Sequence, residues 1–275
     1  MERTKRILAP ERVNQLHLLK ESLRTDPRFD LVRYHLVHRT LRQEAHKKSA
    51  AIEENRSKAK AHRRLESAYE FFMNRYSGVM DIRFLMDTIR IILGSERIIP
   101  LRSCTARASG MGFEYPEDVS AQLEQFCRWD TQITEPIQKA LYTHLHLARI
   151  HPFYDGNGRL ARLIQNCILN KDGFPPIIIG EEDRAVYMTL INHAQREYRD
   201  TRGDLRDRNY LSLDEERKLL ERWKDDNAFL GAKQRAFYEF LAEKLYKTLE
   251  ESKKRVLKIS KSQPKTSSFA SQLLR

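Results

Sequence analysis

Apolar residues at helical spacing predict an amphipathic helix near the middle of the chain, at residues 134–150. Its apolar positions recur every four residues, at Ile137, Leu141 and Leu145. Thr134 is a candidate N-terminal cap, and Pro136 suits the first turn, where a backbone N–H is not needed. We expect the helix to end near His151, because Pro152 disfavours helical geometry in the residue before it.

A second amphipathic helix is predicted to begin at about Arg159. It should end near Asp172 and Gly173, since glycine commonly follows the last residue of a helix. Its apolar residues have the i, i+3, i+4, i+7, i+8 spacing of a helix that buries one face: Leu160, Leu163, Ile164, Cys167 and Ile168. A short polar segment, residues 151–158, joins the two helices.

The rest of the chain also favours helix, with one interruption. No Gly or Pro occurs between Pro27 and Gly78, and this stretch is dense in strong helix formers. Residues 98–119 are rich in turn-forming residues and predict a loop or a short hairpin. Near the C-terminus, residues 212–215 have the form of a capping box. They are followed by a stripe that we expect to pack on the core rather than bind a partner helix: Phe237, Phe240, Leu241, Leu245 and Leu249.

Composition supports an all-α fold. The 275 residues are 40% hydrophobic and 32% charged, and they include only 10 Gly and 9 Pro. No apolar run approaches the ~18 residues of a membrane helix, and the first residues lack a signal peptide's apolar core. We therefore expect a cytoplasmic protein, in the producing cell or, if it is secreted as an effector, in a host cell. The three widely spaced cysteines, Cys104, Cys127 and Cys167, are expected to be reduced packing residues.

The formal net charge of +12 would ordinarily raise nucleic-acid binding as a function. Its distribution argues against that function, because residues 251–275 hold seven basic residues and one acidic residue and so carry half of the excess. The Ser-rich end of this stretch, residues 263–275, is expected to be a disordered basic tail.

The segment between the two central helices, residues 151–162, has the composition of a polyphosphate site. Arg159 and Arg162 are expected on one face of the second helix, opposite its apolar stripe and facing water. Two adjacent guanidinium groups at a helix N-terminus are unfavourable unless an anion neutralises them. Gly156 and Gly158 allow successive backbone N–H groups to turn toward such an anion.

Two further side chains of this segment suggest how a bound polyphosphate would react. Asp155 is a single carboxylate beside the expected cradle, which suits Mg²⁺, because this ion usually takes one or two protein carboxylates plus phosphate oxygens. His151 is the one group of the segment that titrates near neutrality, so it is the natural proton acceptor.

The segment resembles the signature of the Fic domain family, HPFxDGNGRxxR, with every signature position matched. The family is all-helical and typically transfers AMP from ATP to a hydroxyl on a target protein. The resemblance implies that His151 is the general base and Asp155 the metal ligand. It assigns the nucleotide phosphates to five residues: Gly156, Asn157, Gly158, Arg159 and Arg162.

The resemblance extends weakly beyond the signature, over about residues 69–205. Residues 113–119 resemble the family segment after a target-docking flap, which places a short β-hairpin flap near residues 103–109. Tyr187 and Gln195 fall where the family contacts the nucleotide, although Gln195 replaces a common Asn. We therefore expect a Fic-type core at 69–205, an N-terminal helical region at 1–68 and a C-terminal helical extension at 206–262.

Upstream, residues 49–55 resemble the family's inhibitory motif, [S/T]xxxE[G/N]. Ser49 and Ile52 favour Glu53 as the inhibitory carboxylate, whereas Asn55 would favour Glu54 if the Ser requirement were dropped. We choose Glu53.

These features predict a Mg²⁺-dependent enzyme that transfers AMP from ATP to a Ser, Thr or Tyr hydroxyl of another protein, with self-modification as an accompanying reaction. Two alternatives remain open. One is a hydrolase that removes AMP, and the other is a catalytically idle nucleotide-sensing module. No membrane partner is expected.

Overall fold

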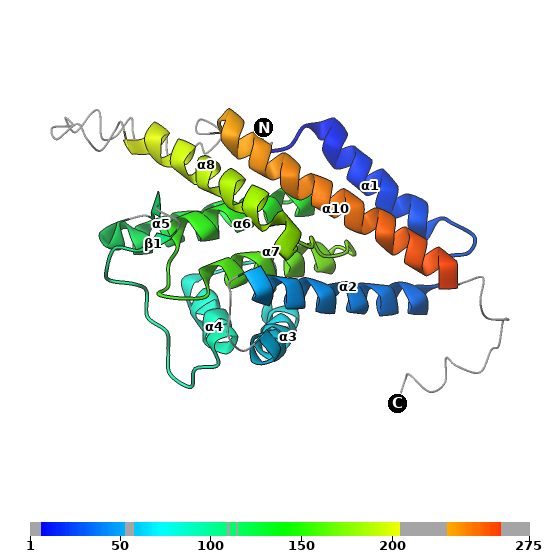
Figure 1. Ribbon diagram of the computed structural model, residues 1–275, viewed down its shortest axis with the longest axis horizontal. Helices are drawn as coiled ribbons and strands as arrows, with labels where there is room; N and C mark the ends of the chain where they lie inside the picture. The colour runs from blue at the N-terminus through cyan, green and yellow to red at the C-terminus, as the bar shows by residue number, and fades with distance from the viewer. Residues whose placement is uncertain (1–6, 53–57, 109–110, 114, 204–229, 260–275) are drawn as a thin grey trace.

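The computed structural model describes residues 7–52, 58–108, 111–113, 115–203 and 230–259 (Figure 1). Its α-helices are α1 (Pro10–Arg24), α2 (Leu31–Ile52), α3 (Lys58–Arg75), α4 (Ile82–Leu93), α5 (Val119–Asp130), α6 (Pro136–Ile150), α7 (Asn157–Lys171), α8 (Arg184–Gly203) and α10 (Ala232–Ile259). Two 3₁₀ turns, η1 (Pro116–Asp118) and η2 (Glu181–Asp183), precede α5 and α8. The predicted all-α fold is confirmed for the described residues.

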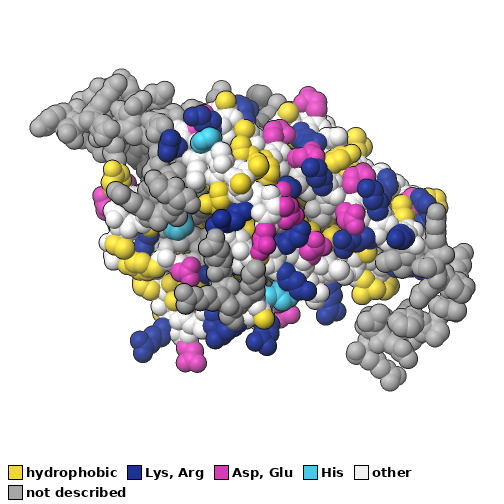
Figure 2. Space-filling model, viewed as in Figure 1, with side chains coloured by type: hydrophobic (Ala, Val, Ile, Leu, Met, Phe, Trp, Pro, Cys, Tyr) yellow, Lys and Arg dark blue, Asp and Glu magenta, His cyan; other side chains and the backbone are white. Residues whose placement is uncertain are grey.

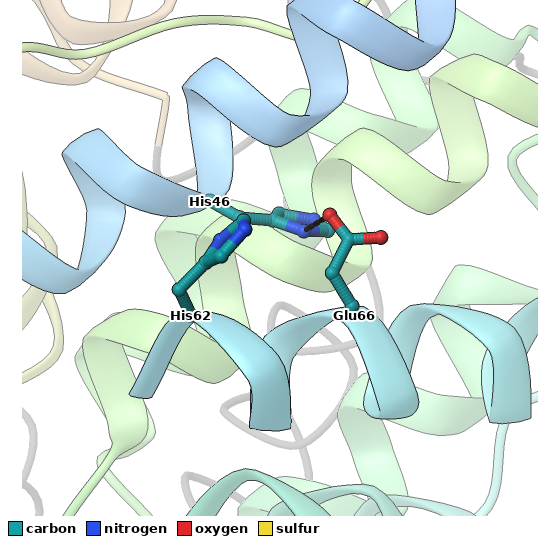
Figure 3. A group of neighbouring side chains, drawn as sticks. All are labelled: His46, His62 and Glu66. Carbon is teal, nitrogen blue, oxygen red and sulfur yellow. Dashed lines mark hydrogen bonds and ion pairs between the residues drawn. The ribbon is translucent and has the colours of Figure 1, made fainter. Parts of the chain in front are cut away.

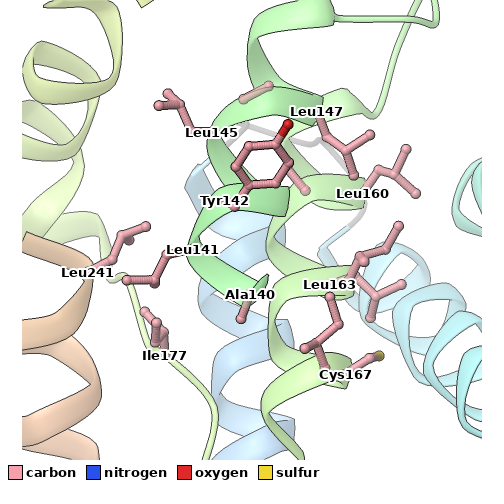
Figure 4. Close-up of a cluster of buried hydrophobic side chains, with 14 of the residues drawn as sticks. Ala140, Leu141, Tyr142, Leu145, Leu147, Leu160, Leu163, Cys167, Ile177 and Leu241 are labelled. Atoms are coloured by element: carbon pink, nitrogen blue, oxygen red, sulfur yellow. The ribbon is translucent and has the colours of Figure 1, made fainter. Parts of the chain in front are cut away.

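The antiparallel pair α6 and α7 forms the centre of the molecule (Figure 4). Both predicted apolar stripes are buried, and Leu141, Leu145 and Leu160 are completely inaccessible to solvent. Burial of such side chains stabilises a fold by roughly 1.5–3 kcal/mol each. The loop that joins the two helices, residues 151–156, is thereby held between two helices in which most residues are buried.

Other helices cover this central pair on several sides. α10 packs along α8 and also contacts α1 and α2, while α3 packs against α2, α4 and α7 (Figure 1). The C-terminal stripe packs on the core as expected, with Phe237, Leu241 and Leu245 fully buried in α10. The packing brings α2, whose last residue is Ile52, against α7.

Residues next to the helices determine where α6 begins and where α7 ends. Glu135, rather than the expected Thr134, caps α6: its carboxylate accepts hydrogen bonds from the backbone N–H groups of Ile137 and Gln138 at 3.1 and 2.6 Å. A carboxylate also suits the positive end of the helix dipole, which explains why Glu135 displaces a hydroxyl cap. α7 ends where predicted, with Gly173 in the left-handed region at φ 72°.

The region predicted as a loop or hairpin contains little regular structure. Two strands of two residues each, β1 (Arg107–Ala108) and β2 (Met111–Gly112), pair antiparallel, with Arg107 opposite Gly112. Residues 103–106 form no strand, so the β structure is shorter than a flap over 103–109, and the docking role of this segment stays a prediction. Cys104 is exposed here, which corrects its assignment as a packing residue, whereas Cys127 and Cys167 are buried.

Among the described residues, no helix is both long and apolar enough to cross a bilayer. On the face shown in Figure 2, basic and acidic side chains are interspersed over α2 and α10 and do not form a stripe of one sign. The capping box at 212–215 and the tail at 263–275 lie outside the described residues.

Candidate active site

The loop between α6 and α7 has a fixed and unusual backbone. His151 ends α6 in the left-handed region at φ 51°, the one non-glycine described residue with positive φ. The Asn157 side chain closes the loop, because its amide accepts from the Phe153 N–H at 3.0 Å and donates to the Phe153 carbonyl at 2.7 Å. A strained backbone that persists in this way is a common feature of functional sites.

Position 156 requires glycine for two reasons, its backbone φ angle and the lack of space for a Cβ atom. Its φ is 79°, and a Cβ added there would lie 2.8 Å from Cδ1 of Ile89 in α4. Glycine therefore lets the start of α7 approach α4 directly, with the backbone N–H groups of its first turn unpaired within the helix.

This loop forms one wall of a cavity of about 330 Å³. The lining residues come from α2, α6, α7, α8 and the segment after β2: Ile52, Phe113, Ala148, His151, Tyr154, Asp155, Gly156, Asn157, Gly158, Arg162, Arg184, Tyr187, Met188, Ile191, Asn192 and Gln195. Of the nine residues predicted for the signature site and nucleotide contacts, eight lie here; Arg159 does not.

The His151 imidazole is largely buried and stacks on an aromatic ring. Its imidazole stacks on Phe113 with the ring centroids 3.7 Å apart and an angle of 15° between the planes. Burial lowers the pKa of His151 to about 4, and the charge of Arg102 lowers it further, against the opposing effects of the Ala148 backbone and Asp155. The imidazole is therefore neutral at pH 7, the form that can accept a proton.

Arg102, which no sequence pattern indicated, fixes the backbone of the loop through hydrogen bonds. Its buried guanidinium donates to the carbonyls of His151, Ile150 and Cys104 at 2.6, 3.2 and 2.9 Å, and its backbone N–H donates to Pro152. These contacts satisfy carbonyls at the C-terminal end of α6. Arg102 lies 49 residues before His151, so no local pattern connects the two.

Asp155 presents its carboxylate to the cavity and is the one acidic residue among the lining residues. One oxygen accepts from the Gly156 N–H at 2.6 Å and the other from Nη2 of Arg159 at 3.0 Å, while 70% of the side chain remains exposed. An accessible carboxylate of this kind can hold Mg²⁺ when phosphate oxygens supply further ligands.

The expectation that Arg159 and Arg162 face water is wrong. Both are buried, with 3% and 5% relative exposure. α4 and α2 pack against α7, and both guanidinium groups have polar partners: Arg159 bonds Asp155 in the preceding loop, and Arg162 bonds Ser49 in α2. Arg159 thus supports the carboxylate instead of lining the cavity.

The C-terminal turn of α2 also reaches the cavity, through Ile52. Arg162 donates from Nε to Oγ of Ser49 at 2.8 Å and from Nη2 to the Ser49 carbonyl at 3.2 Å. Arg184, another cavity residue missed from sequence, donates to the carbonyl of Ile52 at 3.1 Å. Glu53 and Glu54 follow directly but lie outside the described residues.

Residues of α8 also line the cavity, among them Tyr187 and Gln195, which are both buried, and Asn192, which no sequence pattern indicated. The Tyr187 hydroxyl lies 2.9 Å from Nε2 of His144, whose Nδ1 lies 2.5 Å from Oε1 of Gln165. Because Gln165 offers an acceptor, Nδ1 carries the proton and Tyr187 donates to Nε2. Burial lowers the pKa of His144 to about 3, so this relay is uncharged and fixes the tyrosine ring.

A sequence model of the Fic/DOC family matches residues 36–169, from within α2 to within α7. This span includes Ser49, the loop and both signature arginines. The chain therefore contains a Fic/DOC family domain, as the signature predicts.

Curated relatives support the same assignment over a shorter stretch. Over 95 residues, 33% of this chain, it is 44% identical to the protein adenylyltransferase Fic of Nematostella vectensis and 41% identical to the protein adenylyltransferase fic-1 of Caenorhabditis elegans. The matched regions make up 21% and 18% of those proteins, so this chain aligns with about a fifth of their length.

Solved structures share the fold over most of the chain. A Fic domain containing signaling protein from Bacteroides thetaiotaomicron superposes with a TM-score of 0.66 at 19% identity, covering 89% of this chain and 96% of that one. Fic-1 from C. elegans (residues 134–508) superposes with a TM-score of 0.65 at 18% identity, covering 92% and 73%. These likenesses establish a Fic-type helical fold.

Proposed function

We propose that this protein transfers AMP from ATP to a Ser, Thr or Tyr hydroxyl of another protein, with Mg²⁺ bound at Asp155. The observation that carries the proposal is the position of His151. A neutral imidazole lines a cavity that is also lined by Arg162, Arg184 and the N-terminal residues of α7. A base beside an anion-binding surface is what transfer of a nucleotidyl group to a hydroxyl requires.

In the proposed reaction, a ring nitrogen of His151 accepts the proton of the target hydroxyl. The oxygen forms a bond to the α-phosphorus of ATP, the bond from that phosphorus to the bridging oxygen breaks, and pyrophosphate leaves. Arg162 and the N–H groups at the start of α7 stabilise the negative charge of the phosphates. Mg²⁺, when held by Asp155, supplies charge neutralisation of the phosphate oxygens.

The size and lining of the cavity support a nucleotide as its ligand. At about 330 Å³, it falls at the lower end of the ~300–1,000 Å³ that small-molecule sites occupy. The wall that α8 forms combines the apolar side chains of Ile191 and Met188 with the Tyr187 ring and the Gln195 amide, which suits a nucleobase. We assign Tyr187 and Gln195 to nucleobase binding.

We further propose that the protein inhibits itself through Glu53. The supporting observation is that the last turn of α2 already contacts Arg162 through Ser49. A carboxylate following this turn would pair with the guanidinium bidentately and compete with the γ-phosphate. ATP would then bind with its α-phosphate out of line for attack.

The proposed partners are therefore ATP and a hydroxyl-bearing target protein in the cytoplasm, and the enzyme itself is an additional acceptor. One experiment distinguishes AMP transfer from the two alternatives, the hydrolase and the idle nucleotide-sensing module. The full chain is incubated with a cell lysate and with ATP labelled at either the α- or the γ-phosphate.

AMP transfer predicts stable protein label from α-labelled ATP and none from γ-labelled ATP, with release of pyrophosphate. Label from the γ-phosphate would overturn the proposal in favour of phosphoryl transfer. Release of AMP from labelled protein without ATP would identify the hydrolase, and nucleotide binding without any covalent label would identify the sensing module.

A further inference from the structure

A group of metal-ligating side chains lies between α2 and α3, outside the candidate active site. His46 comes from α2, and His62 and Glu66 lie one turn apart on α3 (Figure 3). One ring nitrogen from each histidine and one oxygen of Glu66 all lie within 4.8 Å of one another. In the part of the chain that the structure describes, this is the one such group of three.

The hydrogen bonds within the group leave two imidazole nitrogens unused. Nδ1 of His46 lies 2.8 Å from Oε1 of Glu66. Nε2 of His46 and Nδ1 of His62 are buried and have no hydrogen-bond partner among the described residues. Buried polar atoms are nearly always paired, and two orphan nitrogens in one cluster are unusual unless something binds them.

The Arg42 guanidinium, whose charge opposes a bound cation, also lies beside Glu66. Its Nη2 lies 3.6 Å from Oε2 of Glu66, and its guanidinium carbon lies 4.1 Å from the centre of the Tyr69 ring. This arrangement engages the second carboxylate oxygen and leaves Oε1 toward the histidines.

We propose that His46, His62 and Glu66 form a binding site for a divalent transition-metal ion of the zinc type. Two imidazoles and one carboxylate are ligands for Zn²⁺ and Co²⁺, whereas Mg²⁺ prefers oxygen ligands alone. Water completes the coordination, because Glu66 and His62 are only partly buried. This site is separate from the Mg²⁺ position at Asp155 and does not depend on the proposed transfer activity.

A metal at this position fastens α2 to α3. His46 lies three residues before Ser49, hence on the same face of α2, and both line a small cavity with Arg162. The cavity measures about 10 Å³, the space of a single water molecule. The site thus anchors the turn of α2 that holds Arg162.

The test is a Co²⁺ titration of the full chain, freed of metal by a chelator and kept in excess Mg²⁺ without nucleotide. Visible d–d absorption reports Co²⁺ in a protein site of low coordination number, and displacement by Zn²⁺ gives the zinc affinity. The background is Cys104→Ser, which removes the exposed thiol as a ligand. The variants are His62→Ala and the conservative Glu66→Gln, and the controls are His35→Ala, an exposed histidine of α2, and His151→Ala.

We expect one equivalent of Co²⁺ with intense d–d bands, a zinc affinity at least about tenfold weaker in both variants, and unchanged affinity in both controls. Zn²⁺ should also raise the melting temperature of the parent but not of the variants, which separates lost binding from lost folding. Absence of d–d bands, undiminished affinity in His62→Ala, or loss of binding in His151→Ala would each overturn the proposal. Failure of AMP transfer would not affect these readouts.

Discussion

Arg162 Nε and Ser49 Oγ lie 2.8 Å apart, although 113 residues separate them in sequence. The guanidinium that the signature assigns to phosphate is therefore already engaged by the C-terminal turn of α2. For a phosphate of ATP to bind Arg162 fully, it must compete with the hydrogen bonds that this turn of α2 makes to the guanidinium.

The first prediction concerns the two carboxylates that follow this turn. Glu53→Gly should raise self-labelling from α-labelled ATP by on the order of 100-fold, because a displacement of about 1 Å in the reacting groups costs that much. The measurement is the initial rate of label incorporation. Glu54→Gly is the matched control and should leave the rate near that of the wild type. Activation by Glu54→Gly alone would show that the inhibitory register is shifted by one residue.

The second prediction treats Arg102 as a positioning residue. Arg102→Gln and Arg102→Lys should both lower kcat about tenfold or more, because each has one donor nitrogen where the guanidinium uses three to reach the three carbonyls. Only Arg102→Gln should also move the acid limb of the pH–rate profile to higher pH. In this variant the positive charge that helps to lower the pKa of His151 is absent. An identical acid limb in wild type and Arg102→Gln would rule out the electrostatic part of this role.

The third prediction concerns the metal. Asp155→Ala should abolish AMP transfer together with its dependence on Mg²⁺, since the cavity then has no carboxylate among its lining residues. The check is a Mg²⁺ titration of the initial rate, with Glu117→Ala, an exposed carboxylate before α5, as the control. A variant that keeps the wild-type Mg²⁺ response would place the ion elsewhere.

The fourth prediction is loss of stability in mild acid. Burial lowers the pKa values of His38 and His151 to about 4 and that of His144 to about 3, all below the usual 6.5. Between these values and pH 6.5 the unfolded chain binds more protons than the folded one, so the free energy of unfolding falls as the pH decreases through this window. Each histidine contributes up to roughly 2 kcal/mol between pH 7 and pH 5.

Urea unfolding at pH 7 and pH 5 measures this effect. His38→Leu should show a smaller decrease than the wild type, whereas His35→Leu, which changes an exposed histidine on the same helix, should not. Equal decreases for wild type and His38→Leu would contradict the assignment for that residue.

The sequence was most informative where a pattern is local. The stripes of α6 and α7 and the glycine after α7 were predicted correctly because each depends on residues within one or two helical turns. The burial of Arg159 and Arg162 was not predictable in this way, since it depends on the packing of α4 and α2 against α7.

The same limit explains the residues that were missed. Arg102 contacts the loop across 48 to 49 residues, and Arg184 contacts Ile52 across 132. His46 and His62 lie on different helices, so only their packing brings the imidazoles together. A basic residue in an otherwise irregular segment, such as Arg102 within residues 98–119, was the one available signal, and it is too common to be specific.

The central claim is that His151 is the base of an AMP transfer reaction. The most direct measurement compares the wild type with His151→Ala, using α-labelled ATP, lysate and Mg²⁺, and includes His193→Ala as an exposed histidine of α8. The account predicts that transfer by His151→Ala falls by about 10²-fold to 10⁴-fold while its affinity for Mg-ATP and the activity of His193→Ala stay near wild type. Transfer by His151→Ala at close to the wild-type rate would contradict it.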